Sequence, residues 1–362
     1  MNTVASNSPG ITLTAEGAVS VSYNTLRDAP HSLTPSIEKA FGSNPDSLGI
    51  IVVRDLPATY APARERLLKL AYKFATLPES EREKYADASS RYSFGWSHGK
   101  EIMNGKPDIL KGSYYANPVL DEPAVSDALR KAYPEYYGKN IWPSQTPEVS
   151  DFEQVFKDLG GFVFGVGCQL ATACQPFTSA YFSDSSLSLA DLIKDSQTSK
   201  ARLLHYFPPS PDNPVPAEDE AIDSWCGFHL DHSLLTGLCS AMYLHREPTG
   251  EPTAVTAPSP ASGLYIRTRG GALTKVSIPA DCLAFQTGEA LELATAGRLR
   301  ATPHCVRVGA VPGTGAGNVS RETFALFMQP NVDQRLSATE DFGQFSKRIF
   351  DEHYSEGGAA TM

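Results

Sequence analysis

The stretch GFHLDHSLL, residues 227–235, carries the pattern on which the interpretation of this sequence depends. His229 and Asp231 stand two residues apart. On an extended strand, residues i and i+2 point to the same face. A histidine and a carboxylate on one face can bind one metal ion, although a polar pair at the surface would give the same spacing. The pair therefore predicts a metal site only if further ligands join it.

The sequence around this stretch has the hydrophobic pattern of a β-rich fold. From about residue 202, short apolar runs alternate with Gly, Pro, Asp and Asn. Short strands at such spacing, separated by turn residues, are typical of a sandwich or barrel. The seven runs are LLHYF, LLTGLCSAMYL, GLYIRT, TKVSI, CLAFQTG, RLRATPHCVRV and ETFALFM.

A third ligand is available in the run ATPHCVRV, which contains His304. An apolar barrel has little reason to place a histidine inside it unless the side chain is ligated or paired. Two histidines and one carboxylate on one face of a metal leave coordination sites open, as in non-haem Fe(II) oxygenases. His229, Asp231 and His304 are therefore the predicted metal ligands.

Arg321 and Thr323 form a second i, i+2 pair, in SRETFALFMQP. An arginine that points into a barrel is costly unless it meets an anion. The planar guanidinium fits a carboxylate with two parallel hydrogen bonds, and the threonine hydroxyl can add another donor. The alternative is a solvated arginine at a strand end.

Together these motifs resemble the Fe(II)/2-oxoglutarate-dependent dioxygenase superfamily, in the branch similar to isopenicillin N synthase. The family pattern is H-x-D, a distal His and then R-x-S, which is similar to the five residues above. The segments at 48–85 (LGIIVVRDLPATYAPARERLLKLAYKFATLPESEREKY) and 285–306 (FQTGEALELATAGRLRATPHCV) also resemble that family. The resemblance covers roughly residues 19–333. It implies that His229, Asp231 and His304 hold Fe(II), and that Arg321 and Thr323 bind the distal carboxylate of 2-oxoglutarate.

The same resemblance implies a fold that is mainly β with flanking helices, built on a distorted double-stranded β-helix, or jelly-roll, core. Residues 19–140 would form an N-terminal region of helices and strands, and residues 198–333 the jelly-roll core. A C-terminal helix and tail would occupy residues 334–362. Helical periodicity predicts helices at 62–75, 125–137 and 150–174, the last weakened by its glycines.

The resemblance also suggests where a substrate and the cosubstrate would be contacted. Phe207 stands where many members carry a tyrosine that touches 2-oxoglutarate, and the adjacent Tyr206 is expected to face the other side of its strand. Packing of aromatic side chains between the front half and the barrel is the alternative role for most of the substrate candidates. These candidates are Phe94, Trp96, His98, Tyr114, Tyr115, Asn117 and His205.

Composition limits the function classes. The chain has 362 residues and a formal net charge of −10, which argues against a nucleic-acid partner. No apolar stretch is long enough to suggest a membrane segment, and the first residues lack the pattern of a secretory signal. The six cysteines are scattered without a C-x-x-C pair, as expected for reduced thiols in a cytoplasmic protein.

The predicted function is oxidation of a small organic molecule by O₂, coupled to conversion of 2-oxoglutarate to succinate and CO₂. The alternatives are an oxidase of the same fold that uses no 2-oxoglutarate, a catalytically silent jelly-roll binding protein, and a zinc hydrolase. The sequence leaves the substrate, the reaction outcome and the oligomeric state open.

Overall fold

A computed structural model describes residues 4–5, 10–100, 102–103, 106–107, 109–179, 188–208, 226–247, 250–307 and 318–355. Residues 309–318 (GAVPGTGAGN), whose Gly-rich sequence predicts an extended hairpin loop, lie almost entirely outside these residues. The α-helices are α1 (Tyr23–Asp28), α2 (Thr34–Phe41), α3 (Tyr60–Ala75), α4 (Glu79–Arg82), α5 (Asp127–Ala132), α6 (Pro134–Tyr137), α7 (Phe152–Thr178), α8 (Leu189–Lys194), α9 (Glu289–Ala294) and α10 (Phe342–Ser355). Short 3-10 helices lie at Pro30–Leu33, Glu83–Tyr85, Ala88–Ser90 and Pro147–Val149.

The described strands form one large sheet, one smaller sheet and one two-stranded ribbon. The large sheet has the order β1-β2-β3-β4-β16-β11-β18-β9-β8-β5, and β12 and β13 join it beside β18. Its strands are β1 (Val4–Ala5), β2 (Thr12–Leu13), β3 (Val19–Ser22), β4 (Ile50–Arg54), β5 (Gly95–His98), β8 (Lys111–Ala116), β9 (Lys200–Tyr206), β11 (Leu235–Cys239), β12 (Met242–His245), β13 (Thr253–Val255), β16 (Leu283–Thr287) and β18 (Val319–Met328). The smaller sheet has the order β10-β17-β14-β15, with β10 (Cys226–His229), β14 (Gly263–Arg267), β15 (Leu273–Val276) and β17 (His304–Arg307). The ribbon pairs β6 (Ile102–Met103) with β7 (Lys106–Pro107).

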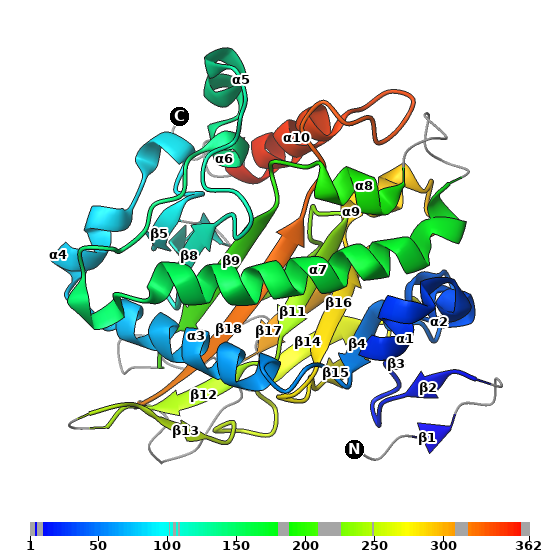
Figure 1. Cartoon of the computed structure of the whole chain (residues 1–362), viewed down its shortest axis with the longest axis horizontal. Helices are drawn as coiled ribbons and strands as arrows, with labels where there is room; N and C mark the ends of the chain where they lie inside the picture. The colour runs from blue at the N-terminus through cyan, green and yellow to red at the C-terminus, as the bar shows by residue number, and fades with distance from the viewer. Residues whose placement is uncertain are drawn as a thin grey trace.

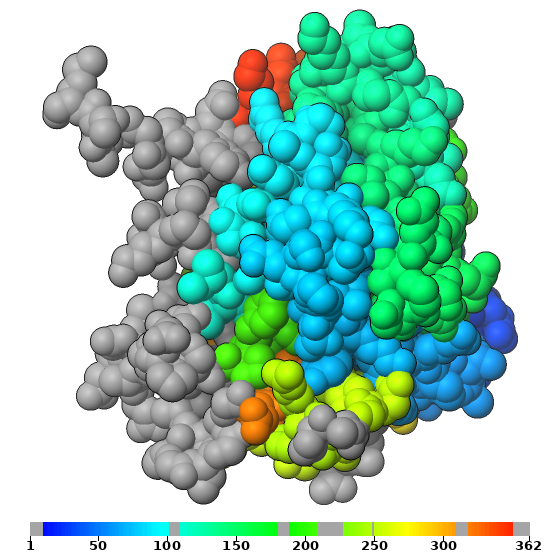
Figure 2. Space-filling model, turned by 90° about the vertical axis from the view of Figure 1, so that its left-hand side faces the viewer, coloured from blue at the N-terminus to red at the C-terminus, as the bar shows by residue number. Residues whose placement is uncertain are grey.

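Helices cover one face of the large sheet. The long helix α7 crosses that face with α3 beside it, and α8 and α10 lie farther along the same side (Figure 1). Apolar residues of α3, α7 and the sheet form one continuous buried cluster. The smaller sheet packs against the opposite face of the large sheet, so the cavity between the two sheets lies away from the helices. On the side shown in Figure 2, α3 meets the hairpin of β12 and β13.

The front half of the chain completes the large sheet at both edges. Strands β3 and β4 pair in parallel with each other, and β4 then pairs with β16. At the other edge, β8 pairs with β9 and β5 pairs with β8. The segment 19–140 is therefore built into the same sheet as the barrel strands. Its strands pair with β16 and with β9, and β9 carries residues of the cavity.

Two predicted helices differ from the observed ones for identifiable reasons. The expected helix at 125–137 is two short helices, because Pro134 cannot donate the backbone hydrogen bond that would continue the first. The expected helix at 150–174 runs unbroken over Phe152–Thr178 despite its glycines. A Cβ atom on Gly160 would lie 2.3 Å from the Cβ of Pro118. At least this glycine serves close packing of the helix against its neighbour, which the sequence alone does not reveal.

Two expectations about composition can be compared with the described residues. In that part of the chain no helix is both long and apolar enough to cross a membrane. Five of the six cysteines are buried and form no disulfide, namely Cys168, Cys174, Cys239, Cys282 and Cys305.

Candidate metal centre and anion site

The three predicted metal ligands meet at one point between the sheets. His229 ends β10, and His304 begins β17 directly opposite it in the strand register. Asp231 follows β10 in the next turn, so it reaches the same point from a loop and not from the expected strand. Its Oδ1 atom lies 3.6 Å from Nε2 of His229 and 3.8 Å from Nε2 of His304. One ligand atom from each residue lies within 4.8 Å of the other two, a spacing that suits a single metal ion.

Hydrogen bonds fix both histidines in the tautomer that a metal requires. Nδ1 of His229 donates to the carbonyl of Gly227 at 2.7 Å. Nδ1 of His304 donates to the carbonyl of Thr302 at 2.9 Å. With Nδ1 protonated, the lone pair of each neutral imidazole is on Nε2, the atom that faces Asp231.

The protonation states also suit a cation. Burial raises the pKa of Asp231, but His304, His229, a hydrogen bond with Thr236 and His232 together lower it more, so the net pKa lies below its ordinary value. Burial, assisted by His229, lowers the pKa of His304. A carboxylate and a neutral imidazole are therefore the expected forms at neutral pH, and both are metal ligands without loss of a proton.

A glycine allows the loop that holds Asp231 to pack closely. A Cβ atom on Gly288 would lie 2.2 Å from the backbone oxygen of Ser233 and 2.7 Å from that of Asp231. The next residue, Glu289, donates its backbone N–H to the same Asp231 oxygen at 2.7 Å. The turn between β16 and α9 thus holds the Asp231 loop by backbone contacts.

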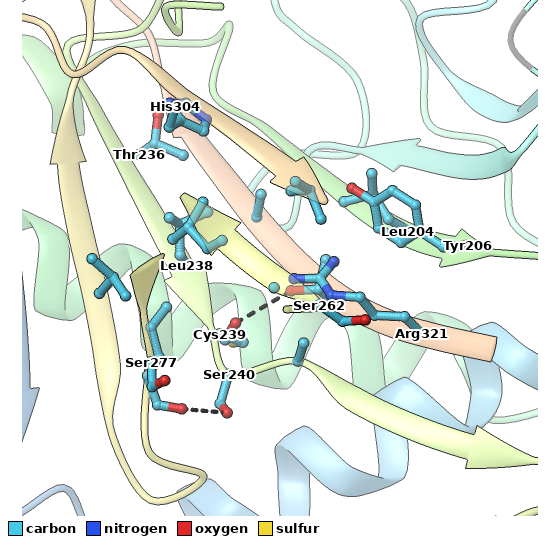
Figure 3. A pocket seen from close by; sticks show the side chains of 18 of the residues that line it. Leu204, Tyr206, Thr236, Leu238, Cys239, Ser240, Ser262, Ser277, His304 and Arg321 are labelled. Atoms are coloured by element: carbon cyan, nitrogen blue, oxygen red, sulfur yellow. Dashed lines mark hydrogen bonds between the residues drawn. The ribbon is translucent and has the colours of Figure 1, made fainter. Parts of the chain in front are cut away.

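Arg321 lines the same cavity as the three predicted ligands, and Figure 3 shows it at some distance from His304. The cavity has a volume of about 250 Å³. The Arg321 residue is 6% exposed, and its Nε and Nη1 atoms have no hydrogen-bond partner among the described residues. Its guanidinium lies 5.0 Å from the ring centre of Tyr206. A buried guanidinium with two unused donors can bind an anion.

Thr323 lines the cavity one pleat along β18 from Arg321, as the i, i+2 spacing predicts. Its hydroxyl donates to the carbonyl of Cys239 at 3.2 Å. The oxygen can still accept a hydrogen bond, and it can donate to a ligand only by turning away from Cys239.

The expectation that Tyr206 faces away from the cavity is wrong. On β9, Arg202, Leu204 and Tyr206 line the cavity, while Leu203 and His205 face the helical side. Phe207 follows the strand and packs against His205, with ring centres 4.4 Å apart. Tyr206 is therefore the tyrosine that lies beside Arg321. Phe207 does not line the cavity, so it does not stand at the position of that tyrosine.

None of the seven substrate candidates lines this cavity. Phe94, Trp96 and Tyr114 are almost completely buried. Trp96 and Tyr114 pack on Phe74, with ring centres 5.3 and 5.0 Å away, and Phe94 lies under the ammonium group of Lys200. These three aromatic residues belong to the core of the front half, as the alternative interpretation had it.

The other four candidates have structural contacts as well. His98 bonds the carbonyl of Ile109 and stacks on Phe207, and the amide oxygen of Asn117 accepts the backbone N–H groups of Val119 and Leu120. His205 is buried on the helical side of β9, where its Nδ1 lies 2.9 Å from Oε2 of Glu322. Tyr115 contacts a residue of the cavity lining, because its ring centre lies 5.0 Å from Cζ of Arg202.

Two basic residues of the cavity were missed in the sequence. Arg202 and Lys275 both line it. Lys275 donates from Nζ to the carbonyl of Pro260. The alternation of β9 would have identified Arg202, because it lies four residues before Tyr206 and hence on the same face.

Comparisons with known proteins find relatives through structure only. No protein-family model and no curated protein matches the sequence. A 2OG-Fe(II) oxygenase family protein from Caulobacter crescentus superposes with a TM-score of 0.63 at 19% identity, over 92% of this chain and 99% of that one. A full-length Neurospora crassa protein in complex with alpha-KG and thymine gives 0.61 at 16%, over 94% and 99%. The Arabidopsis thaliana dioxygenase for auxin oxidation 1, in its 2-oxoglutarate complex, gives 0.54 at 15%, over 88% and 94%.

The structural similarity to these three proteins establishes the fold. The chain has the jelly-roll fold of 2-oxoglutarate-Fe(II) oxygenases, with the flanking helices that the sequence predicted, so the predicted fold class is confirmed. The similarity extends over almost the whole length of this chain and of each of the three. It does not single out the branch similar to isopenicillin N synthase.

Proposed function

We propose that this chain, which has the fold of the solved 2-oxoglutarate-Fe(II) oxygenases, is an Fe(II)- and 2-oxoglutarate-dependent dioxygenase of a small organic molecule. The observation that carries the proposal is the cavity that joins two binding sites. One end holds His229, Asp231 and His304, and another part holds the buried guanidinium of Arg321. A metal site alone would fit several enzyme classes, but the additional anion site fits a dicarboxylate cosubstrate.

The residues present fit an Fe(II) ion. The donor set of two imidazole nitrogens and one carboxylate is the facial triad of non-haem Fe(II) oxygenases. The Oδ2 atom of Asp231 is buried and has no hydrogen-bond partner among the described residues, although its carboxyl is expected to be ionised. A buried carboxylate without such a partner is costly, and a bound cation would remove that cost. When bound, the iron would supply activation of O₂ for attack on a substrate C–H bond.

The cosubstrate fits the part of the cavity that leads from the ligands to Arg321. The buried guanidinium of Arg321, whose Nε and Nη1 atoms lack partners among the described residues, would donate to the distal carboxylate of 2-oxoglutarate, with Thr323 beside it. The keto-acid end would then face the metal ligands. The walls between the two ends include Leu204, Leu238 and Val306, which exclude water from the carbon chain.

The overall reaction balances without a further reductant. One O₂ molecule supplies one oxygen atom to the substrate and one to succinate, while 2-oxoglutarate loses CO₂ and supplies two electrons. The protein would bind and orient the reactants and exclude water from them, and the bound iron would supply the oxidation chemistry.

The alternatives lack a comparable observation. An oxidase that needs no 2-oxoglutarate leaves the unused donors of Arg321 unexplained. A zinc hydrolase would also need a general base, and among the described residues the lining of the cavity contains one carboxylate, Asp231, which the metal would use.

The test is conversion of 2-oxoglutarate to succinate by the purified protein, with Fe(II) or Zn(II) added under air. Fe(II)-dependent succinate formation that Asp231→Ala abolishes is the expected result, because the variant loses the carboxylate ligand of the site. Equal succinate formation in Asp231→Ala would refute the proposal. For compartment, we propose the cytoplasm, which the unpaired state of the five described cysteines supports.

A further inference from the structure

We infer that His205 and Glu322 are positioning residues of the cosubstrate site, because their hydrogen-bonded pair fixes the strand register that presents Arg321 to 2-oxoglutarate. This inference rests on the proposed function, since it concerns the same cavity. The proposed function uses neither side chain, and both lie on the face of the sheet that the helices cover.

The pair is completely buried behind the cavity wall. His205 is 2% exposed and Glu322 is 0% exposed. Nδ1 of His205 lies 3.0 Å from Oε1 and 2.9 Å from Oε2 of Glu322, so this N–H donates to both carboxylate oxygens. The hydroxyl of Ser320 donates to Oε1 of the same carboxylate at 2.6 Å. Burial of a carboxylate is costly, and buried polar pairs of this kind can specify one arrangement of the elements that carry them.

Aromatic side chains hold the imidazole of His205 in place. The ring of Tyr72, on α3, stands edge-on to the imidazole, with ring centres 6.0 Å apart. Phe207 stands edge-on to the same imidazole at 4.4 Å. Helix α3 contacts both β9 and β18, so it covers the pair. The imidazole therefore has little freedom to turn, and its hydrogen bond ties β9 to β18 at this position.

The strand register connects the pair to the cosubstrate site. His205 pairs with Glu322, and the next pair along the two strands is Tyr206 with Arg321. Adjacent residues of a strand point to opposite faces, so His205 and Glu322 lie directly behind the tyrosine and the arginine of the cavity. A slip of one residue between β9 and β18 would exchange the faces of one strand. It would take either Arg321 or Tyr206 out of the cavity.

The apolar pattern of β18 does not prevent such a slip near Arg321. Residues 320–323 are Ser, Arg, Glu and Thr, so both faces of the strand are polar over this stretch. The apolar helical face begins only at Phe324 and continues with Leu326. A register that apolar burial does not specify needs another interaction. The His205–Glu322 pair supplies it at the end of the strand where the cosubstrate carboxylate would bind.

The test is calorimetric titration of 2-oxoglutarate into the anaerobic Fe(II) protein. His205→Leu removes the donor and should raise the Kd about tenfold at unchanged iron content, because Arg321 is then less well placed for a hydrogen bond to a charged group. His205→Asn keeps a donor near the position of Nδ1 and should restore part of the affinity. Tyr136→Phe is the matched control, because it loses a buried hydrogen bond with Ser346 outside the cavity, and it should keep the Kd.

A double variant distinguishes positioning from a general loss of stability. If His205 acts through Arg321, His205→Leu should change the Kd little in an Arg321→Gln background, so the two effects are not additive. Three results would overturn the inference: an unchanged Kd in His205→Leu, an equal rise in Tyr136→Phe, or the full rise from His205→Leu in the Arg321→Gln background. Failure of the unaltered protein to bind 2-oxoglutarate would instead refute the proposed function.

Circular dichroism verifies the fold of each variant. If His205→Leu does not fold, Glu322→Gln takes its place in both comparisons. This variant removes the charge and one of the two acceptor oxygens, so the Kd should rise in the same direction. An unchanged Kd in Glu322→Gln would then overturn the inference.

Discussion

Replacement of Arg321 by glutamine should weaken 2-oxoglutarate binding and leave Fe(II) binding intact. Two guanidinium nitrogens, Nε and Nη1, are buried without a partner among the described residues, and each can donate a hydrogen bond to an anion. A hydrogen bond to a charged group is worth about 1.5–3 kcal/mol. Loss of one bond therefore raises the Kd about ten- to a hundredfold, and loss of both raises it further. The measurement is calorimetric titration of 2-oxoglutarate into the anaerobic Fe(II) protein.

Two companion variants sharpen this prediction. Arg321→Lys keeps the charge but lacks the planar fork, so it should recover part of the affinity. Thr323→Val removes a hydroxyl whose donor is already used by Cys239, so it should change the Kd less than any Arg321 variant. An unchanged Kd in Arg321→Gln, or a larger effect from Thr323→Val, would refute the role that we assign to the arginine.

Three further predictions concern the metal and the fold. Alanine at each of the three proposed metal ligands should abolish stoichiometric Fe(II) binding, measured by metal analysis, while circular dichroism stays unchanged. Gly160→Ala should destabilise the protein by about 1–3 kcal/mol, because its Cβ would overlap Pro118. Gly161→Ala has open space and should stabilise α7 by up to ~1 kcal/mol. Urea unfolding measures both variants, and equal changes in their free energies of unfolding would contradict the close packing of Gly160. Burial lowers the pKa of Lys200 from 10.5 to about 7, so between these values the unfolded chain binds the extra proton and the free energy of unfolding should rise with pH. Lys200→Met should remove that slope in urea unfolding, and an unchanged slope would assign it to other groups.

The sequence was sufficient for the fold class and for the set of residues that meets at the centre. Its motifs are local pairs, His229 with Asp231 and Arg321 with Thr323, and each depends only on neighbours in the chain. His304 was found because a histidine in an apolar strand needs a partner. These motifs can be recognised without knowing how the sheets pack.

The sequence did not show which side chains of a strand face the cavity, nor how deeply an aromatic residue is buried. Tyr206 and Phe207 are adjacent, and a shift of one residue exchanges which of them faces the cavity. Trp96 and Tyr114 were predicted to be pocket residues, although both fill the core under α3, because aromatic residues suit either place equally. Arg202 was overlooked because Tyr206 was expected to face away from the cavity, and Arg202 lies four residues earlier on the same face of β9.

The pairing of a metal site with an anion site in one cavity is tested most directly by anaerobic absorption spectroscopy. Addition of 2-oxoglutarate to the Fe(II) protein should produce a visible metal-to-ligand charge-transfer band that saturates at one equivalent, because the keto acid and the iron then share the cavity. The band should be absent from Asp231→Ala, and its midpoint should shift to higher 2-oxoglutarate concentration in Arg321→Gln. Absence of the band from the unaltered protein with full iron content would contradict the account.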